Sequence, residues 1–431
     1  MKTLILSVAV FFSLNPQSAG QADNHQPSPN TRQSTKITYQ PPITITKGGT
    51  YSGNWQSLDA SIPAVSIRTT EPVIIENCTI RSRGHLITTR FSDRDAQTGT
   101  NVTVRNCRGY GLKSQVSGKA PGFFFLTVYP KRVVLENNYW EHTRGAVAIG
   151  DNTFRNVSEI RVNRNRVANV DGRTSNGARC DTSKNDIPFV TANGMCGAGF
   201  VVINGFLKVA KIEVAWNEVI NQPYNSHAED MVNIYNSSGT ATTPIQIHDN
   251  YIQGVYPANP AKDGCTGSGI NAGDGDSEVD AAHAAAFVHA FNNQVVSSAN
   301  VGIFIAAGHD SRLYGNRVVS SGYLPGNKKI ANHFTGMYVW DCCYGQTKKN
   351  PPVFFNNWAY DNAIGYAWVT KNGQQIRDDT YFPDCAKTSG GETRCVRNRS
   401  LPNPITRATE QAEYQRWKQK VLSSGIVIGP T

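Results

Sequence analysis

The chain has 431 residues, and its 42 Lys and Arg against 32 Asp and Glu give a formal net charge of +10. With 39 % hydrophobic residues it can bury a sizeable core, which argues against a disordered chain. The one strongly apolar stretch, Leu4 to Leu14, is shorter than the about 20 residues that a membrane-spanning helix needs. An integral membrane protein is therefore disfavoured. A cytosolic enzyme is also disfavoured, because the stretch fits the apolar part of a secretory signal peptide.

The N-terminus has the pattern of a secretory signal peptide. Lys2 precedes the apolar stretch, and the small residues Ser18, Ala19 and Gly20 follow it. We predict a signal peptide over residues 1–20, a flexible lead-in over 21–36, and a secreted product, extracellular or periplasmic. Loss of Lys2 would leave a net charge of about +9.

Nine cysteines follow this segment, so at least one thiol has no partner within the chain. In an oxidising compartment, cysteines that close short loops are natural disulfide pairs. We predict disulfides between Cys180 and Cys196 and between Cys385 and Cys395. A zinc site is not predicted, because no CxxC-like spacing with histidine partners is present.

An internal repeat runs through most of the chain. Its template is apolar, any, apolar, two polar residues, an anchor that is usually Asn, any, apolar. The copies with an Asn anchor include those at Asn138, Asn165, Asn217, Asn250 and Asn293. Cys78 and Trp358 stand at the anchor position of two more copies, and a partial copy surrounds Cys107.

Each copy alternates with period two, so we interpret each copy as one short strand with one apolar face. A second strand, usually opened by glycine, lies between copies, as in Gly199–Ile203 and Gly302–Ala306. Short strands that recur every 20–50 residues, with Gly and Asn turns, predict a β-solenoid. The Asn anchors fit, because their side chains bond backbone within a turn and stacked copies satisfy one another.

With this pattern the chain resembles the right-handed parallel β-helix proteins of the pectate-lyase-like superfamily over residues 37–372. The resemblance implies an all-β, single-stranded β-helix of about ten coils, with long turn loops about 168–198, 254–268 and 320–335. A β-propeller is the alternative, but its blades keep a steadier period.

Residues 373–431 form a C-terminal extension that contains the Cys385–Cys395 loop. Its helical pattern runs from Thr409 to Leu422, with Tyr414 and Trp417 on one face. We expect this helix to cap the C-terminal end, because an uncapped solenoid exposes sheet edges. A helix that binds a partner is the alternative.

The resemblance places a substrate groove along one sheet, under long turn loops. Each second strand opens with a glycine or, in one coil, with Asp230. The fifth residue after each of these opening residues should lie in this groove, close to its equivalents, because adjacent strands lie about 4.8 Å apart. These residues are Asn204, Tyr235, Asp274, Ala307 and Asp341. We therefore predict that acids, a tyrosine and His309 gather on consecutive coils, with Asn204 and Asn233 as substrate-binding groups.

The segment Asp274–Asp280 carries carboxylates at every second position. Asp274, Asp276 and Glu278 in a Gly-containing loop are a candidate calcium site, since calcium prefers oxygen ligands. The segment does not fit the EF-hand pattern. A solvated acidic turn is the alternative.

His309 and Asp310 form a second candidate group, because a histidine can act as general base near neutral pH. A turn in which the histidine bonds backbone explains the same residues. The resemblance to polygalacturonase-like enzymes implies a Gly-His-Gly, an Asp-Asp and an Arg-Ile-Lys in order. Here Gly308-His309-Asp310 is present, but Asp378-Asp379 follows it, which is the wrong order.

His227, Glu229 and Asp230 put three titratable groups at a strand entrance, where most coils have glycine. They are a candidate acid/base or binding cluster, or Asp230 caps a turn. Tyr338 and Trp340 are outward residues on one strand and suit stacking on sugar faces. Packing beneath a loop or the C-terminal helix is the alternative for this aromatic pair.

The positive charge of an exported protein favours an anionic partner, and the fold resemblance implies a uronate-containing polysaccharide. No nucleic-acid motif is present. The leading hypothesis is a monomeric lyase that acts by β-elimination, with calcium on the uronate carboxylate, His309 as base and Tyr235 as acid. The alternatives are a glycoside hydrolase that uses Asp274, Asp310 and Asp341, an epimerase, and a non-catalytic carbohydrate-binding or adhesion protein.

Overall fold

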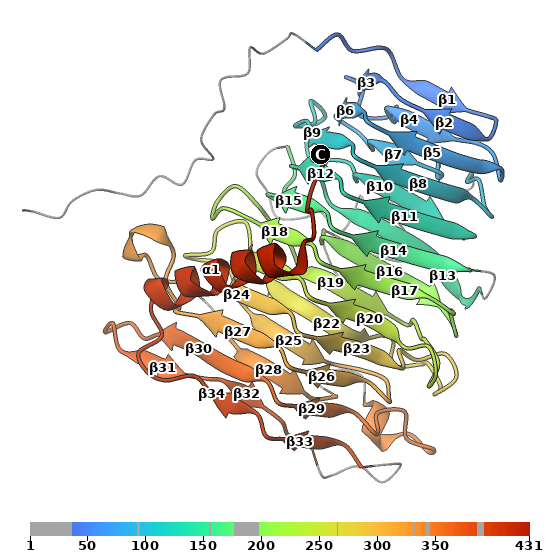
Figure 1. Ribbon diagram of the computed structural model, residues 1–431. Helices are drawn as coiled ribbons and strands as arrows, with labels where there is room; N and C mark the ends of the chain where they lie inside the picture. Colours follow the sequence, from blue (N-terminus) through green and yellow to red (C-terminus); the bar gives the residue numbers. More distant parts are fainter. Residues whose placement is uncertain are drawn as a thin grey trace, which may run out of the picture. The chain divides into compact units, whose positions relative to one another are not determined.

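The strands wind into a right-handed β-helix of eleven coils, as Figure 1 shows. The computed structural model describes residues 37–92, 95–154, 157–175, 198–264, 266–331, 333–341, 345–385 and 392–431. Tyr39 to Thr431 form one structural unit. The predicted signal peptide, the lead-in and the predicted Cys180–Cys196 disulfide lie outside the described residues.

Three sheets run along the β-helix, and each coil adds one strand to each sheet. The first sheet has the strands β1 (Ile43–Ile45), β4 (Val65–Ile67), β7 (Ile87–Thr88), β10 (Phe125–Val128), β13 (Ala146–Phe154), β16 (Val201–Phe206), β19 (Asp230–Tyr235), β22 (Ser268–Asp274), β25 (Val301–Ile305), β28 (Thr335–Val339) and β32 (Thr380–Tyr381).

The second sheet is also parallel throughout. It has the strands β2 (Gly49–Tyr51), β5 (Pro72–Glu76), β8 (Asn101–Arg105), β11 (Arg132–Glu136), β14 (Glu159–Asn163), β17 (Ile212–Ala215), β20 (Ile245–His248), β23 (Val288–Phe291), β26 (Arg312–Tyr314), β29 (Trp358–Tyr360) and β33 (Arg394–Val396).

The third sheet is parallel as far as β30, with which β31 pairs antiparallel and β34 parallel. It has the strands β3 (Asn54–Ser57), β6 (Thr79–Ser82), β9 (Arg108–Gly111), β12 (Tyr139–Glu141), β15 (Arg166–Ala168), β18 (Glu218–Ile220), β21 (Tyr251–Val255), β24 (Gln294–Ser298), β27 (Arg317–Ser320), β30 (Ala363–Val369), β31 (Gln375–Arg377) and β34 (Arg399–Ser400). Two 3-10 turns, η2 (Pro325–Asn327) and η3 (Gln346–Lys348), lie in the connections.

The structure corrects the interpretation of each repeat copy as one strand. The copy around Asn138 spans two strands, β11 and β12, with Asn138 in the corner between them. The residue before the anchor breaks the strand, because it takes left-handed φ, 53° at Asn137 and 51° at Asp249. Each coil therefore has three strands, and the glycine-opened strand belongs to the first sheet.

The anchor asparagines form a buried ladder between the second and third sheets. Asn250 Nδ2 donates to the Val214 carbonyl at 2.8 Å and to Asn293 Oδ1 at 2.9 Å, while Asn250 Oδ1 accepts from the backbone and side-chain nitrogens of Asn217. Each side chain thus bonds neighbouring coils. This satisfies backbone groups that the corner leaves unpaired.

Two disulfides are present among the described residues. The predicted Cys385–Cys395 disulfide is confirmed. The second one, Cys78–Cys107, was missed although its sequence signal is clear: both cysteines occupy the anchor position in successive coils, and stacking brings their Cα atoms to 4.6 Å. Both disulfides are consistent with an oxidising, extracytoplasmic compartment.

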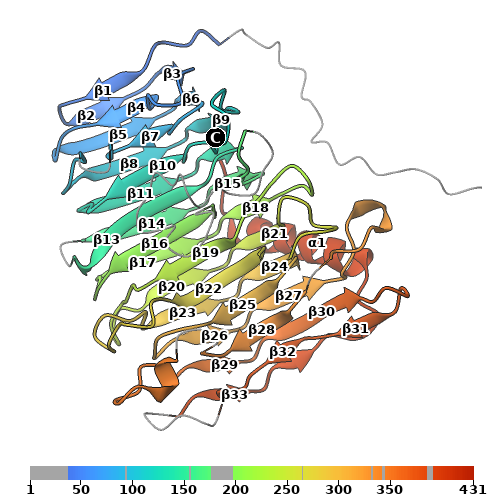
Figure 2. The same cartoon turned by 180° about the vertical axis from the view of Figure 1, so that it is seen from behind.

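The predicted C-terminal helix is present as α1 (Arg407–Ser424), capped by Thr406 and Gly425. Its position differs from the expected one over the end of the coil stack. Glu413 bonds Arg317 and Gln294, and the following tail reaches back to Asn137, so α1 lies along the outside of the third sheet (Figures 1 and 2). No helix in the described part of the chain is both long and apolar enough to cross a membrane.

The three predicted long loops all connect the third sheet to the first. They join β15 to β16, β21 to β22 and β27 to β28. All three therefore lead into strands of the first sheet at the same corner of the coil, beside the outer face of that sheet.

Candidate functional site on the first sheet

The outer face of the first sheet changes from apolar to polar and back along the coil axis. The inner residues of β16, β19 and β22 pack in the core. The outward residues are paired in register from coil to coil, in the order Val147, Val202, Asn233, Asn271, Phe304 and Tyr338. The polar stretch occupies β19 and β22, between two apolar clusters.

Two carboxylates and an amide form the centre of this polar stretch. Asn233 Nδ2 donates to Asp274 Oδ2 at 2.8 Å and to Asp230 Oδ2 at 3.1 Å. Asn271 Nδ2 also approaches Asp230 Oδ2, at 3.3 Å. Because the two carboxylates share one nitrogen as donor, their Oδ2 atoms lie within about 6 Å of each other.

The carboxylate pair has an unusual protonation equilibrium. Burial and the neighbouring charge of Asp274 raise the pKa of Asp230 to about 7, although hydrogen bonds from Asn271, Ser268 and Asn233 oppose this shift. Two like charges at this distance are costly in a low dielectric, which favours the protonated form of a carboxyl group in this pair. Such a group can exchange a proton with a bound molecule.

Tyr235 and Asp276 form a second pair at the end of the same strands. The Tyr235 hydroxyl donates to Asp276 Oδ1, and Asn236 Nδ2 donates to Asp276 Oδ2 at 2.8 Å. Burial, the hydrogen bond to Asp276 and the charges of Asp276 and Asp274 raise the pKa of Tyr235. The phenol is therefore protonated, with a carboxylate placed to receive its proton.

The predicted register is present for three of the five positions that follow the strand openers. Asn204 pairs with Tyr235, and Tyr235 pairs with Asp274. Asp341 lies in the turn after β28, where its Oδ2 accepts from the backbone and hydroxyl of Thr347. The structure therefore does not bring Asp341 into the carboxylate pair.

His309 and Asp310 lie in the corner that leads to the second sheet. His309 Nδ1 bonds Asp310 at 2.7 Å, and Nε2 bonds the Ala281 carbonyl at 2.8 Å. Its ring stacks on Phe355, with centroids 4.6 Å apart. Although burial opposes it, the hydrogen bond from His309 lowers the pKa of Asp310. Both ring nitrogens thus have partners, which is the arrangement of the turn alternative.

The remaining predicted residues lie in turns and strands next to the polar stretch. His227 lies in the turn before β19, where its backbone N–H donates to the Val170 carbonyl. The backbone carbonyl of Glu229 accepts from the backbone N–H of Ser268. Tyr338 is only 6 % exposed and packs against Phe304. These contacts fit the packing alternative for Tyr338.

Trp340 continues the same aromatic cluster and is partly exposed. It lies edge-on to Tyr381, with ring centroids 5.1 Å apart. It is therefore the better placed of the two predicted aromatic residues for contact with a ligand.

The predicted calcium ligands do not form one set. Asp274 and Asp276 have separate hydrogen-bond partners, Glu278 is exposed, and the described residues contain no group of three His, Cys, Asp or Glu side chains that could hold a metal ion. Asn233 Oδ1 is a buried oxygen without a hydrogen-bond partner, but Asn233 turns its Nδ2, not this oxygen, toward the carboxylates of Asp230 and Asp274.

Sequence reasoning missed Asn271 and Asn236. Asn271 lies on β22 and donates to Asp230, whereas Asn236 directly follows β19 and donates to Asp276. The ladder of outward residues that pairs Asn233 with Asn271 was the available signal.

No family model matches the chain, and no curated protein matches it. Among solved structures it is similar to a family 6 polysaccharide lyase from Pseudopedobacter saltans, with 11 % identity and a TM-score of 0.40 over 87 % of this chain and 94 % of the other. A mannuronic-acid-specific family 6 lyase from human gut microbiota has 10 % identity and a TM-score of 0.41 over 91 % and 90 %. An alginate lyase of the same family, in complex with a trisaccharide, has 12 % identity and a TM-score of 0.22 over 84 % and 91 %. The predicted fold class is confirmed by the structure of this chain itself, with its three parallel sheets.

Proposed function

We propose that the protein is an exported enzyme that cleaves a uronate-containing polysaccharide by β-elimination on the outer face of the first sheet. The observation that carries the proposal is the carboxylate pair Asp230–Asp274, joined by hydrogen bonds from Asn233 Nδ2 to both, beside the Tyr235–Asp276 pair. Elimination needs a base for the C5 proton and an acid for the leaving oxygen, and the two pairs supply one of each.

Two proton transfers accompany the elimination. Tyr235 Oη takes the C5 proton while its own proton passes to Asp276. As the bond from C4 to the glycosidic oxygen breaks and the C4–C5 double bond forms, the Asp230–Asp274 pair gives its proton to the leaving oxygen. His309 is not needed as the base. A calcium ion held by Asp230 and Asp274 would displace the proton that this pair donates, so the proposed step uses the pair without calcium.

The test uses pectate, alginate and glucuronan as substrates, with calcium and with chelator. Elimination leaves an unsaturated uronate whose ultraviolet absorbance rises with time. We expect D230N and Y235F to lose at least about a hundredfold in initial rate, since positioned acids and bases contribute about 10²–10⁴-fold. The control E278Q, at an exposed neighbour, should keep its activity.

A retaining glycoside hydrolase is the second candidate, because the upper limit of about 6 Å on the distance between the two Oδ2 atoms lies below the about 6.5–9.5 Å of inverting enzymes. New reducing ends without a rise in absorbance would replace elimination by hydrolysis. If none of the three polymers gave either product, both activities would be contradicted.

A further inference from the structure

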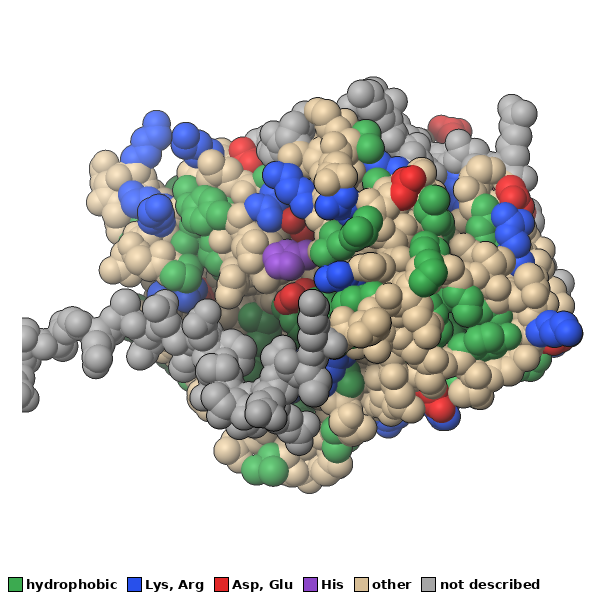
Figure 3. Space-filling model, turned by 90° about the horizontal axis from the view of Figure 1, so that it is seen from above, with side chains coloured by type: hydrophobic (Ala, Val, Ile, Leu, Met, Phe, Trp, Pro, Cys, Tyr) green, Lys and Arg blue, Asp and Glu red, His purple; other side chains and the backbone are tan. Residues whose placement is uncertain are grey.

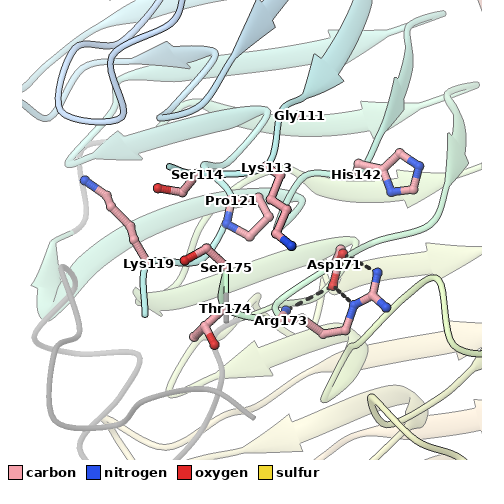
Figure 4. A pocket seen from close by; sticks show the side chains of 10 residues that line it. All are labelled: Gly111, Lys113, Ser114, Lys119, Pro121, His142, Asp171, Arg173, Thr174 and Ser175. Carbon is pink, nitrogen blue, oxygen red and sulfur yellow. Dashed lines mark hydrogen bonds and ion pairs between the residues drawn. The ribbon is translucent and has the colours of Figure 1, made fainter. Parts of the chain in front are cut away.

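A pocket of about 380 Å³ lies beside the first sheet, in coils that precede Asp230. It occupies the corner between the third and first sheets, and the connections from β9, β12 and β15 form its walls. The charged and titratable residues that line it are Lys113, Lys119, His142, Asp171 and Arg173 (Figure 4). Its volume is in the range of small-ligand sites.

Among the described residues that line it, the pocket has more basic than acidic side chains: Lys113, Lys119 and Arg173 against Asp171. Arg173 and Asp171 neutralise each other, with Nε–Oδ1 at 2.8 Å and Nη2–Oδ2 at 2.7 Å. Lys119 Nζ donates to the Ala60 carbonyl at 2.9 Å, and its charge contributes to lowering the pKa of Asp59 after the hydrogen bonds from Ser61. The Lys113 ammonium has no partner among the described residues. Figure 3 shows basic side chains gathered beside a histidine at a hollow in the molecular surface.

The other lining groups suit a sugar. Ser114 and Ser175 supply hydroxyl groups, and Pro121 supplies an apolar surface. A few polar groups that converge around an apolar patch are typical of small-ligand sites. The combination of hydroxyl groups with two ammonium groups fits a sugar that carries an anionic group.

The pocket is connected to the carboxylate pair through the backbone. Asp171 forms a parallel bridge with His227 on the next coil, and His227 precedes Asp230 by three residues. Three extended residues span about 10 Å, and one coil adds about 4.8 Å. Asp171 and Asp230 therefore lie within about 15 Å of each other, a distance that a few sugar units of a bound polymer span.

We infer that this pocket binds the carboxylate of a uronate unit, a few units from the unit that reacts in the same polysaccharide. This inference rests on the proposed function for the identity of the polymer, but the pocket can be tested without catalysis. Its role is to bind and position, so it should affect substrate affinity and leave the chemical step unchanged.

The experiment measures binding by isothermal titration calorimetry with uronate tetrasaccharides from pectate, alginate and glucuronan. A neutral glucan tetrasaccharide, a sulfated tetrasaccharide and inorganic phosphate are the comparison ligands. All proteins carry D230N to prevent turnover, and the variants are K113Q, K113Q with K119Q, and the control K47Q at an exposed lysine. Circular dichroism checks that each variant is folded.

We expect at least one uronate tetrasaccharide to bind to the protein that carries D230N alone. Its affinity for K113Q should be about tenfold lower, and its affinity for the double variant lower still. K47Q should leave the affinity unchanged. In the active background the same variants should raise KM with kcat unchanged. This binding result would stand even if no cleavage were found, which separates it from the proposed function.

Three results would overturn the inference. The first is that no uronate tetrasaccharide binds. The second is equal binding to K113Q, the double variant and K47Q. The third is that inorganic phosphate or the sulfated sugar binds as tightly as the best uronate, which would make the pocket a general anion site.

Discussion

At the scale of single residues, the proton of the Asp230–Asp274 pair links folding to pH. The pKa of Asp230 is raised to about 7 from 3.8, so the folded protein binds this proton more tightly than the unfolded chain. Its contribution to stability is complete below about pH 4 and is lost as the pH rises through 7. We expect the free energy of unfolding to fall by on the order of 2–4 kcal/mol over this range.

Urea denaturation of wild type and D230N from about pH 4 to pH 8 tests this linkage. D230N cannot titrate at this position, and its amide can still accept from Asn233 and Asn271, so its stability should vary less with pH. The exposed E278Q should follow the wild type. The same pH dependence in D230N and wild type would show that the proton does not reside on this pair.

The same residues mark the limit of what the sequence could predict. The register of Asn204, Tyr235 and Asp274 followed from counting, because stacked strands place equivalent positions side by side. The donor that joins Asp230 to Asp274 did not follow, because it depends on Asn233 and on a register shift in β22. Hydrogen bonds between side chains of neighbouring coils depend on the positions of both strands, which the sequence alone does not give.

At the scale of the elements, α1 shows why the location of a helix on the fold is harder to predict than the presence of the helix. Its buried residues are Glu410, Glu413 and Trp417, so two of three are acidic. Apolar periodicity identified the helix but not its partners. The side chain of Glu413 is held by Arg317 Nη2 at 2.6 Å and by Gln294 Nε2 at 2.9 Å, which fixes the helix to the third sheet.

Trp417 should be the main apolar anchor of α1. It is fully buried, stacks on Tyr251 with centroids 5.9 Å apart, and donates to Glu218 at 3.1 Å. We expect W417A to cost about 3–5 kcal/mol, or less if the helix detaches first. Hydrogen exchange should then quicken within residues 407–424 and stay slow in β14, whereas Q415A at an exposed position should change neither. Equal loss of protection in both would mean that α1 and the coils unfold together.

At the scale of the whole molecule, the coil stack is nearly one-dimensional, because each coil pairs only with its two neighbours. The two disulfides lie near opposite ends: Cys78–Cys107 joins successive coils through the corner ladder, and Cys385–Cys395 closes a loop beside β33. Local opening should therefore remain local.

The matched double variants C78S/C107S and C385S/C395S test this arrangement. The sequence separations of 29 and 10 residues predict losses of roughly 3–4 and roughly 2–3 kcal/mol in the chain-entropy model. We expect the first variant to speed hydrogen exchange in β5 and β8 and the second in β29 and β33, with the central strands β17 and β20 protected in both. If either variant lowered protection equally along the whole stack, the coils would unfold as one cooperative unit. The carboxylate pair on β19 and β22 would then depend on both ends, whereas local opening would leave it intact when one end frays.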